Sequence, residues 1–529
     1  MEITEYYGVC LAAVLALLLV PLLLFAAGWL REYVGHDINC LLNPLLPAWL
    51  SGQALISRYE AALFGCLLVA NGLYIGVGNT SIDEAERRLG HVALINLVLM
   101  SCGAHMNHIV SICGIRHDRY FRFHASLGSI FTAEAVLHTI LALRNWSIGD
   151  MAGLIASCSV GATAVSSLLC HWLFELFSLI HMLLSSATLV ALWFHLPSTP
   201  LNERPRLYLF LCSVLLISIK LIRFLNIIYS SFSGRRQSTA TIQKHGDCVE
   251  IRVRMARPLK FQAGQFVYLS LWGLSALSAF EFHPFQICWV DDIDQNSQDS
   301  QGPRQVIVLL AQARRGFSRR LLTATRYEHR ALIEGPYGKT LPLGQYGTVL
   351  LFATDMGIAG QLPYIRELLD HYRQCQTKTR RIALFWELHA EDYRYWVKPE
   401  MDKMLRLDVD YILDMQLYVR GHFLSRRTSE GDVVPLGEHG RITLNYEAMR
   451  PDVIVASEMK TLCTDPATTR AIMSKNAVYQ NDQAERKENK MVKPQQNDNQ
   501  DVWQKDVHVK MLDFQPWARG KMDARSLVI

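Results

Sequence analysis

Long apolar stretches with few charges occupy the first 230 residues of this chain and limit what it can fold into. Only 25 of the 101 Asp, Glu, Lys and Arg residues lie in that part, and the first lysine is Lys220. The other 299 residues carry the remaining 76 charges. This segregation excludes a single soluble globule and a wholly disordered chain. It predicts a membrane part followed by a soluble part.

Seven of these stretches are long enough to cross a hydrocarbon core of about 30 Å as helices. They run near residues 7–30, 59–78, 91–110, 120–143, 151–171, 173–196 and 206–229. The first has an acidic leader with Glu2 and Glu5, and its apolar run is too long for a signal peptide. We therefore expect a retained helix, with cleavage as the alternative.

The orientation of the helices follows from their number. Arg31 after the first helix, with acidic residues before it, favours an outside N-terminus, and seven crossings then place the C-terminal part in the cytosol. The glycosylation sequons that begin at Asn79 and Asn145 both fall in loops assigned to the outside. The sequence thus predicts a multi-pass glycoprotein of the plasma membrane that contacts the lipid bilayer directly.

Two matched histidine pairs are the strongest signal in the membrane part. His124 and His138 lie in the fourth stretch and His181 and His195 in the sixth, each pair with thirteen residues between. Fourteen helical residues span about 21 Å and return close to the same face. With both helices starting in the cytosol, His124 should face His181 and His138 should face His195. Imidazole is a common axial ligand of haem iron, so the pattern predicts two bis-histidine iron sites at two depths. The alternative is that these histidines only bond neighbouring helices, but the repeated spacing argues against it.

The charge balance and the cysteine spacing argue against several kinds of partner and site. The net charge of +5 is spread over both parts, so no nucleic-acid partner is expected. The twelve cysteines include no C-x-x-C pair, which argues against a disulfide framework, a zinc ribbon or a cysteine-ligated iron–sulfur cluster.

The soluble part changes its pattern twice. Residues 249–255, 265–271 and 283–289 have the alternation of strands in a small barrel, and Gly316 precedes a helix expected from Arg319. After residue 338 the pattern becomes that of an α/β nucleotide-binding domain. It has strands at 348–353 and 381–387, a glycine-containing turn at 354–360 and a helix at 362–372. Residues 474–506 are too polar to pack and read as a disordered insertion or an irregular gene model.

The order and content of these features resemble the fungal ferric-chelate reductases of the NADPH oxidase superfamily. In the membrane part the resemblance rests on Phe123-His124-Ala125-Ser126-Leu127-Gly128 and on Phe174-Glu175-Leu176-Phe177 before His181. In the soluble part it rests on the segments Ala263-Gly264-Gln265-Phe266, His283-Pro284-Phe285, Gly316-Phe317-Ser318, Glu334-Gly335-Pro336-Tyr337-Gly338, Gly357-Ile358-Ala359-Gly360-Gln361-Leu362-Pro363-Tyr364 and Asp513-Phe514-Gln515-Pro516-Trp517.

The resemblance implies a fold, cofactors and an activity. It implies a multi-pass α-helical haem domain at 1–230, a ferredoxin-reductase-like β-barrel FAD domain at 231–345 and an α/β NADPH domain at 346–529. Electrons would pass from cytosolic NADPH through FAD and two haem b groups to an extracellular ferric or cupric chelate, with a metal permease as a downstream partner. The cofactors perform the chemistry, so no catalytic side chain is assigned.

The resemblance also assigns cofactor-binding residues. His283, Pro284, Phe285, Gln286, Gly316 and Ser318 would hold FAD, and Gly335, Pro336, Gly338, Gly357, Ile358, Ala359 and Gly360 would receive NADPH. Two departures bear on the NADPH site. Asp355 stands where the family has glycine, and a carboxylate there would repel phosphate by about 1 kcal/mol or more unless it points away. The strand expected before Cys463 is short, with little more than residues 460–462.

Three other functions share part of this pattern. A superoxide-generating NADPH oxidase has the same cofactors and differs in its acceptor, so oxygen uptake would distinguish it. A four-histidine cytochrome with a membrane or ascorbate donor would not need the flavin and nucleotide modules. A non-catalytic haem membrane protein with a decayed nucleotide site would keep the histidines and lose NADPH-driven reduction.

Overall fold

The computed structural model describes residues 58–101, 117–145, 151–170, 173–196, 200–201, 203–275, 278, 281–291, 305–313, 316–338, 340–420, 431–436, 440–464, 510–513 and 525–528. It divides into two compact units. The first contains Met1–Gly234 and Leu332–Lys339, and the second contains Arg235–Ala331 and Thr340–Ile529.

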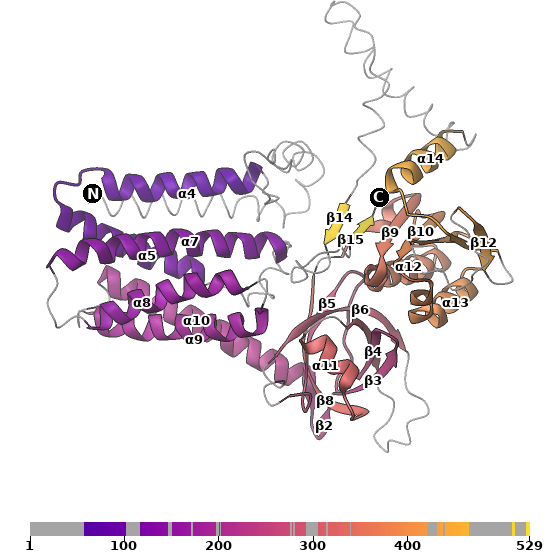
Figure 1. The fold of residues 1–529 in the computed structure, drawn as a ribbon, viewed down its shortest axis with the longest axis horizontal. Coiled ribbons are helices and arrows are strands. Elements are labelled where there is room, and N and C mark those ends of the chain that lie inside the picture. The colour runs from indigo at the N-terminus through magenta and orange to yellow at the C-terminus, as the bar shows by residue number, and fades with distance from the viewer. Residues whose placement is uncertain are drawn as a thin grey trace, which may run out of the picture. The chain divides into compact units, whose positions relative to one another are not determined.

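The first unit is a set of antiparallel helices (Figure 1). The described helices are α4 (Arg58–Gly76), α5 (Ile82–Ser101), α7 (His117–Ala142), α8 (Met151–Ser166), α9 (Phe174–His195) and α10 (Arg204–Ser231). Within the described residues, four spans are long and apolar enough to cross a membrane: Tyr120–Ala142, Met151–Leu169, Leu176–His195 and Arg204–Ser231. Large apolar side chains such as Phe194 and Ile217 are exposed on these helices, as expected of surfaces that face lipid.

The predicted count of seven helices is only partly covered by the described residues. The first predicted stretch, 7–30, lies outside them. The third was predicted at 91–110, but α5 begins at Ile82 and takes in Asp83 and Glu84 in its first turn. The helix starts early because a capping signal precedes its apolar run, and charged side chains are tolerated at a helix end outside the hydrocarbon.

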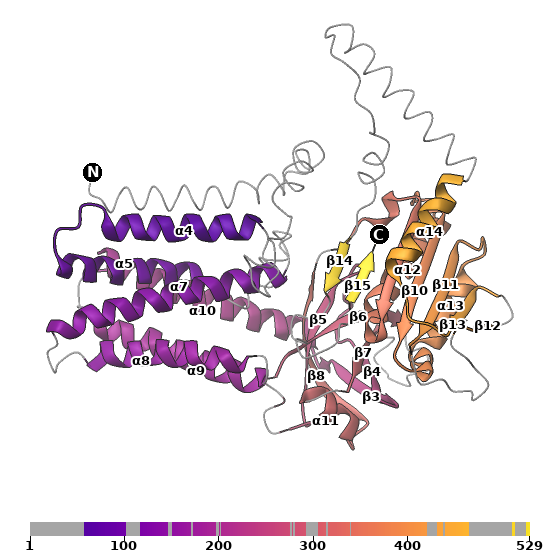
Figure 2. The ribbon, with the colours of Figure 1, turned by 45° about the horizontal axis from the view of Figure 1, so that its top comes forward.

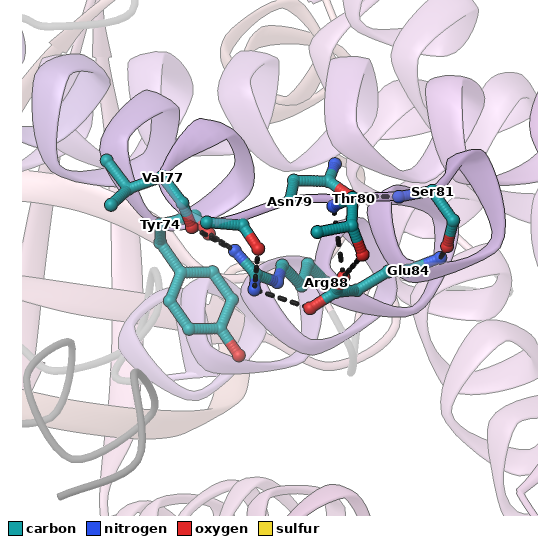
Figure 3. A network of polar contacts seen from close by, with 8 residues as sticks. Tyr74, Val77, Asn79, Thr80, Ser81, Glu84 and Arg88 are labelled. Carbon is teal, nitrogen blue, oxygen red and sulfur yellow. Dashed lines mark hydrogen bonds and ion pairs between the residues drawn. The ribbon is translucent and has the colours of Figure 1, made fainter.

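That capping signal belongs to a polar network between α4 and α5, drawn in Figure 3. The Ser81 hydroxyl accepts the Glu84 N–H at 3.2 Å, and the Glu84 carboxylate accepts the Thr80 N–H at 3.3 Å. Arg88 is buried and donates to the carbonyl oxygens of Tyr74 at 3.0 Å and Val77 at 2.6 Å. These bonds use the carbonyls left free where α4 ends, so they fix the tight connection between the two helices.

The soluble part begins with a closed six-stranded barrel. Its strands are β3 (Thr239–His245), β4 (Cys248–Arg254), β5 (Phe266–Leu271), β6 (His283–Asp291), β7 (Val306–Gln312) and β8 (Glu328–Tyr337), in the order β3-β4-β7-β6-β5-β8. The short helix α11 (Phe317–Thr323) lies between β7 and β8. The predicted barrel strands are confirmed, and closure leaves no unpaired strand edge.

The chain continues as an α/β layer structure (Figure 2). Four parallel strands, β9 (Thr348–Thr354), β10 (Arg381–Leu388), β11 (Leu413–Val419) and β13 (Ile442–Asn445), form its centre. Antiparallel strands extend the sheet at both sides: β12 (Val433–Leu436), β15 (Arg525–Val528) and β14 (Lys510–Asp513). The predicted strands at 348–353 and 381–387 are therefore confirmed.

Helices cover both faces of this sheet. On one face, α12 (Ile358–Arg373) and α13 (Lys398–Leu407) pack against Leu351 and Trp386. On the other face, α14 (Pro451–Thr464) packs Ile454 and Val455 near Phe352 and Phe385. This arrangement is typical of a sheet that is buried on both sides.

The short strand predicted before Cys463 is wrong, because residues 460–463 belong to α14. Pro451 is the first residue of this helix, where its missing N–H costs nothing, and Ile454 and Val455 reach the sheet one turn later. Glu458 then accepts hydrogen bonds from Arg381 of β10 at 2.8 and 3.3 Å. The predicted insertion at 474–506 lies outside the described residues.

Candidate cofactor sites

The predicted histidine pairs face each other in the first unit. The rings of His124 on α7 and His181 on α9 have centroids 6.2 Å apart, at an interplanar angle of 65°. The rings of His138 and His195 are 6.4 Å apart, at 74°. Two metal–imidazole bonds of about 2 Å each, plus the two ring radii, come to about 6 Å. Each gap therefore has the width that one metal ion with a histidine on either side would need.

The small number of protein ligands limits which metal centre these histidines could bind. No group of three or more His, Cys, Asp or Glu side chains gathers at a metal site anywhere in the described part of the chain. A structural zinc site takes four protein ligands, so two histidines alone would not make one. Haem iron brings four ligands of its own and needs only two axial ones. The two pairs thus fit haem better than a bare ion.

Neighbouring backbone orients His138 of the second pair. His138 Nδ1 lies 2.9 Å from the carbonyl oxygen of Glu86 on α5. A carbonyl can only accept, so Nδ1 carries the proton and Nε2 keeps its lone pair for a metal. A Cβ at Gly90 would lie 3.2 Å from the His138 ring, so the ring packs closely over this glycine. No pattern in the sequence indicates either contact, because both cross between helices.

The two predicted flavin motifs meet in the barrel. His283 of β6 stacks on Phe317 of α11, with ring centroids 4.1 Å apart and 24° between planes. Phe285, two residues along β6, has its ring centroid 6.1 Å from that of Phe317. Gly316 has φ +59°, a conformation suited to glycine, and is the residue immediately before α11. Helix α11 begins at Phe317, two residues before its predicted start, and places Ser318 in its first turn.

Charges flank this contact. Glu281 forms an ion pair with Arg320 and lies 3.7 Å from His283 Nε2. The nearby His283 ring and the Arg320 charge hold the pKa of Glu281 below its usual range. Gln286 lies on β6 opposite Phe266 of β5. Its Nε2 is buried and has no hydrogen-bond partner within the described residues. A buried amide that donates to nothing is costly, and a polar ring edge of a bound flavin would satisfy it.

The glycine segment after β9 is shorter than predicted. Asp355, Met356 and Gly357 form one 3-10 turn, and Ile358 already begins α12. Ile358, Ala359 and Gly360 are buried in the first helical turn. This turn therefore starts at the carboxyl end of a parallel strand, the edge at which open α/β sheets bind ligands.

Asp355 is held by the neighbouring strand. Its φ is +41°, its Oδ1 accepts the His389 N–H at 2.8 Å, and its carbonyl accepts the Trp386 indole N–H at 2.8 Å. The carboxylate that was expected to oppose phosphate thus bonds to the backbone just after β10. The remaining predicted NADPH residues, Gly335, Pro336 and Gly338, fall in the first compact unit, while Gly357 to Gly360 fall in the second. Their joint role stays a prediction.

Two motifs of the resemblance contact each other. Gly264 has φ +83°, and a Cβ there would lie 2.0 Å from the Tyr364 hydroxyl oxygen. The Ala263 N–H donates to the Glu367 carboxylate at 3.0 Å. Tyr364 is buried, which raises the pKa of its hydroxyl, and the Leu341 backbone bonds to that oxygen. The two motifs therefore join the barrel to α12.

Comparison with known proteins finds one matching domain family and several similar proteins. Residues 233–341 match the model of an FAD-binding domain. The chain is 24% identical over 302 residues to ferric/cupric reductase transmembrane component 2 of Saccharomyces cerevisiae, covering 53% of this chain and 40% of that protein. It is also 24% identical over 303 residues to ferric reductase transmembrane component 3 of the same yeast, with the same coverage of 53% and 40%.

This chain thus spans 40% of the length of each of these two yeast relatives. Among solved structures, a ferredoxin reductase in carbazole 1,9a-dioxygenase matches at 14% identity and a TM-score of 0.29, covering 44% of this chain and 62% of that one. That likeness is too low to carry weight. The chain is thus similar to ferric reductase transmembrane components, and its residues 233–341 match an FAD-binding domain.

Proposed function

We propose that this chain carries electrons across a membrane, from NADPH through FAD and two b-type haems to a ferric or cupric chelate. The observation that carries the proposal is the two facing histidine pairs, 6.2 and 6.4 Å apart, on the same two membrane helices. A hydrocarbon core of about 30 Å is too thick for one direct electron jump, so two centres at different depths are required. Similarity to a ferric/cupric reductase component supports the choice of acceptor.

Each part of the chain has a role in this proposal. Residues 1–230 form the haem domain, 231–345 the FAD domain and 346–529 the NADPH domain. When bound, FAD and the haems would supply the redox chemistry, which converts a two-electron hydride transfer into single-electron steps. The chain supplies the geometry. The Glu86 carbonyl sets the tautomer of His138, and the stacked His283 and Phe317 would hold the flavin.

The direction of transfer follows from the helix parity. The FAD and NADPH domains lie in the cytosol and the His138/His195 pair lies toward the outside of the plasma membrane. One contact supports placing Asn79 and Asn145 on the same side of the membrane. His138, near the end of α7, lies beside Glu86, near the start of α5. The connection that follows α4 and the one that follows α7 are therefore at the same end of the unit. A metal permease that takes up reduced metal is the downstream partner that fits such an activity.

Haem content tests the proposal directly. His138→Ala or His195→Ala should each reduce the haem content of the purified chain from two to one, measured by absorbance after extraction. His124→Ala and His181→Ala should remove the other haem. His91→Ala is the matched control, because His91 also lies on a helix of this unit, and it should leave two. If His138→Ala and His195→Ala both retain two haems, the pairing is wrong.

A further inference from the structure

A buried carboxyl group lies among the membrane helices, between the levels of the two histidine pairs. Glu134 of α7 is 5% exposed and lies inside the apolar span Tyr120–Ala142. Its Oε1 accepts the Asn71 side-chain N–H of α4 at 2.7 Å, and its two oxygens accept Asn96 Nδ2 of α5 at 3.0 and 2.7 Å. Asn71 is 3% exposed and Asn96 is 0% exposed. Three helices that lie side by side in Figures 1 and 2 therefore meet at one acid.

No cation pairs with Glu134 among the described residues. Ionisable groups do lie on the packed helices. Arg88 is the closest arginine along α5, and its charge is already paired with Glu84 at 2.5 Å. Helix α8 carries no Asp, Glu, Lys, Arg, His or Tyr. Further ionisable side chains on these helices are Tyr74 of α4, Arg87 and His91 of α5, His138 of α7 and, packed on α5 from α10, Arg204 and Tyr208.

The cluster can satisfy the acid in both protonation states. A charged Glu134 accepts N–H groups from two amides. Asn96 Oδ1 is buried and accepts no hydrogen bond within the described residues. Rotating the Asn96 amide by 180° would present that oxygen to Glu134, where a protonated carboxyl could donate to it. Asn96 can thus donate to the charged acid or accept from the neutral one, so the carboxyl group itself keeps a hydrogen bond in either state.

The position of Glu134 connects it to the proposed electron path. It precedes His138 by four residues, about 6 Å along α7, and follows His124 by ten residues, about 15 Å. Both the Glu134 carboxyl and the His138 ring contact α5, through Asn96 and Glu86 respectively. An electron that reaches the His138/His195 centre adds negative charge close to an acid that has no cation. In a low-dielectric interior such like charges repel strongly.

We propose that Glu134 is a proton-binding site coupled to reduction of the His138/His195 centre. One electron arrives from the flavin side and reduces the iron, and one proton from water binds the Glu134 carboxylate, forming its O–H bond. Oxidation by the external acceptor returns the proton to water. The acid thus balances the electron's charge inside the membrane. This inference rests on the proposed function, because it requires the outer haem.

The test is the midpoint potential of each haem against pH, measured by spectroelectrochemistry on the purified holoprotein. Reduction favours the protonated acid, so the potential of the outer haem should fall as pH rises through the titration of Glu134. A tenfold change in proton affinity on reduction corresponds to 59 mV for one electron. In Glu134→Gln the side chain is always neutral, so that haem should keep the high potential at every pH. Asp83→Asn, which removes a carboxylate from the exposed start of α5, should leave the slope as it is.

Infrared difference spectra of the same samples give a second readout. Reduction of the wild type should produce a carboxylic acid C=O band that is absent in Glu134→Gln. If that variant does not bind two haems, Asn96→Leu keeps the acid and removes one of its two amide donors, and should shift the band to higher frequency. An outer-haem slope that persists in Glu134→Gln, or a wild type with neither slope nor band, overturns the inference. A protein without two reducible haems would instead contradict the proposed function.

Discussion

The contact between Gly264 and Tyr364 predicts an unusually severe effect of adding one methyl group. In Gly264→Ala the new Cβ would lie 2.0 Å from the Tyr364 hydroxyl oxygen and 2.8 Å from its ring carbon Cζ. The φ of +83° adds about 1–2 kcal/mol of strain for a residue with a side chain. Overpacking adds about 1–3 kcal/mol, and losing the Leu341 bond to Tyr364 about 1 kcal/mol. The total is roughly 3–6 kcal/mol, a large part of the stability of an ordinary domain.

Thermal unfolding of the purified chain, monitored by the release of its flavin, measures this effect. We expect the unfolding temperature of Gly264→Ala to fall by roughly 10 °C or more. Gly246→Ala is the matched control, because Gly246 also has a positive φ, +63°, but nothing lies within 4 Å of its added Cβ. Tyr364→Phe in the Gly264→Ala background should recover only part of the loss, since Cζ still overlaps. If Gly264→Ala is no less stable than Gly246→Ala, the reasoning is refuted.

Three further predictions concern the soluble part. Asp355→Asn keeps an acceptor for the His389 N–H and removes a negative charge from the turn after β9. Repulsion of about 1 kcal/mol between that charge and the phosphate would be lost, so the KM for NADPH should fall about fivefold. An unchanged or higher KM in steady-state kinetics would show that the charge does not face the nucleotide. Burial raises the pKa of Cys248 and Cys288, so an alkylating reagent should spare both thiols in the native protein and modify exposed Cys375, as mass spectrometry of labelled peptides would reveal. Protease added to intact cells should leave residues 231–529 whole, and cleavage there would reverse the proposed orientation.

Local regularity explains which features the sequence could predict. The spacing of His124 and His138 depends only on the geometry of one helix, so the facing pairs with His181 and His195 could be expected from the sequence alone. The alternation of the barrel strands and the buried strand at 348–353 are local in the same sense. The features that could not be predicted depend on partners far away in the sequence.

The glycine segments illustrate that limit. Ala263-Gly264 and Gln361-Leu362-Pro363-Tyr364 carry part of the family resemblance. In the structure, the positive φ of Gly264 and the buried Tyr364 serve a contact between the barrel and α12. The turn after β9 was expected to reach Gly360, whereas Ile358 and Ala359 are apolar enough to pack inside a helix that starts earlier. Composition marks a glycine segment but does not separate a cofactor turn from a close packing contact.

Glu134 is the functional candidate that sequence reasoning missed, although a signal was present. It is the only acidic residue in the stretch 120–143, and an ionisable side chain within a membrane span usually has a role. Its partners Asn71 and Asn96 lie 63 and 38 residues before it, so only the packing of three helices brings the cluster together.

The most direct test of the central claim is anaerobic addition of NADPH to membranes that contain this chain, with haem absorbance followed over time. We expect both haems to become reduced in the wild type, and only the inner haem in His138→Ala. Adding a ferric chelate should then reoxidise the wild-type haems. Haems that are present and reducible by dithionite, but stay oxidised with NADPH, would contradict a continuous path from nucleotide to membrane.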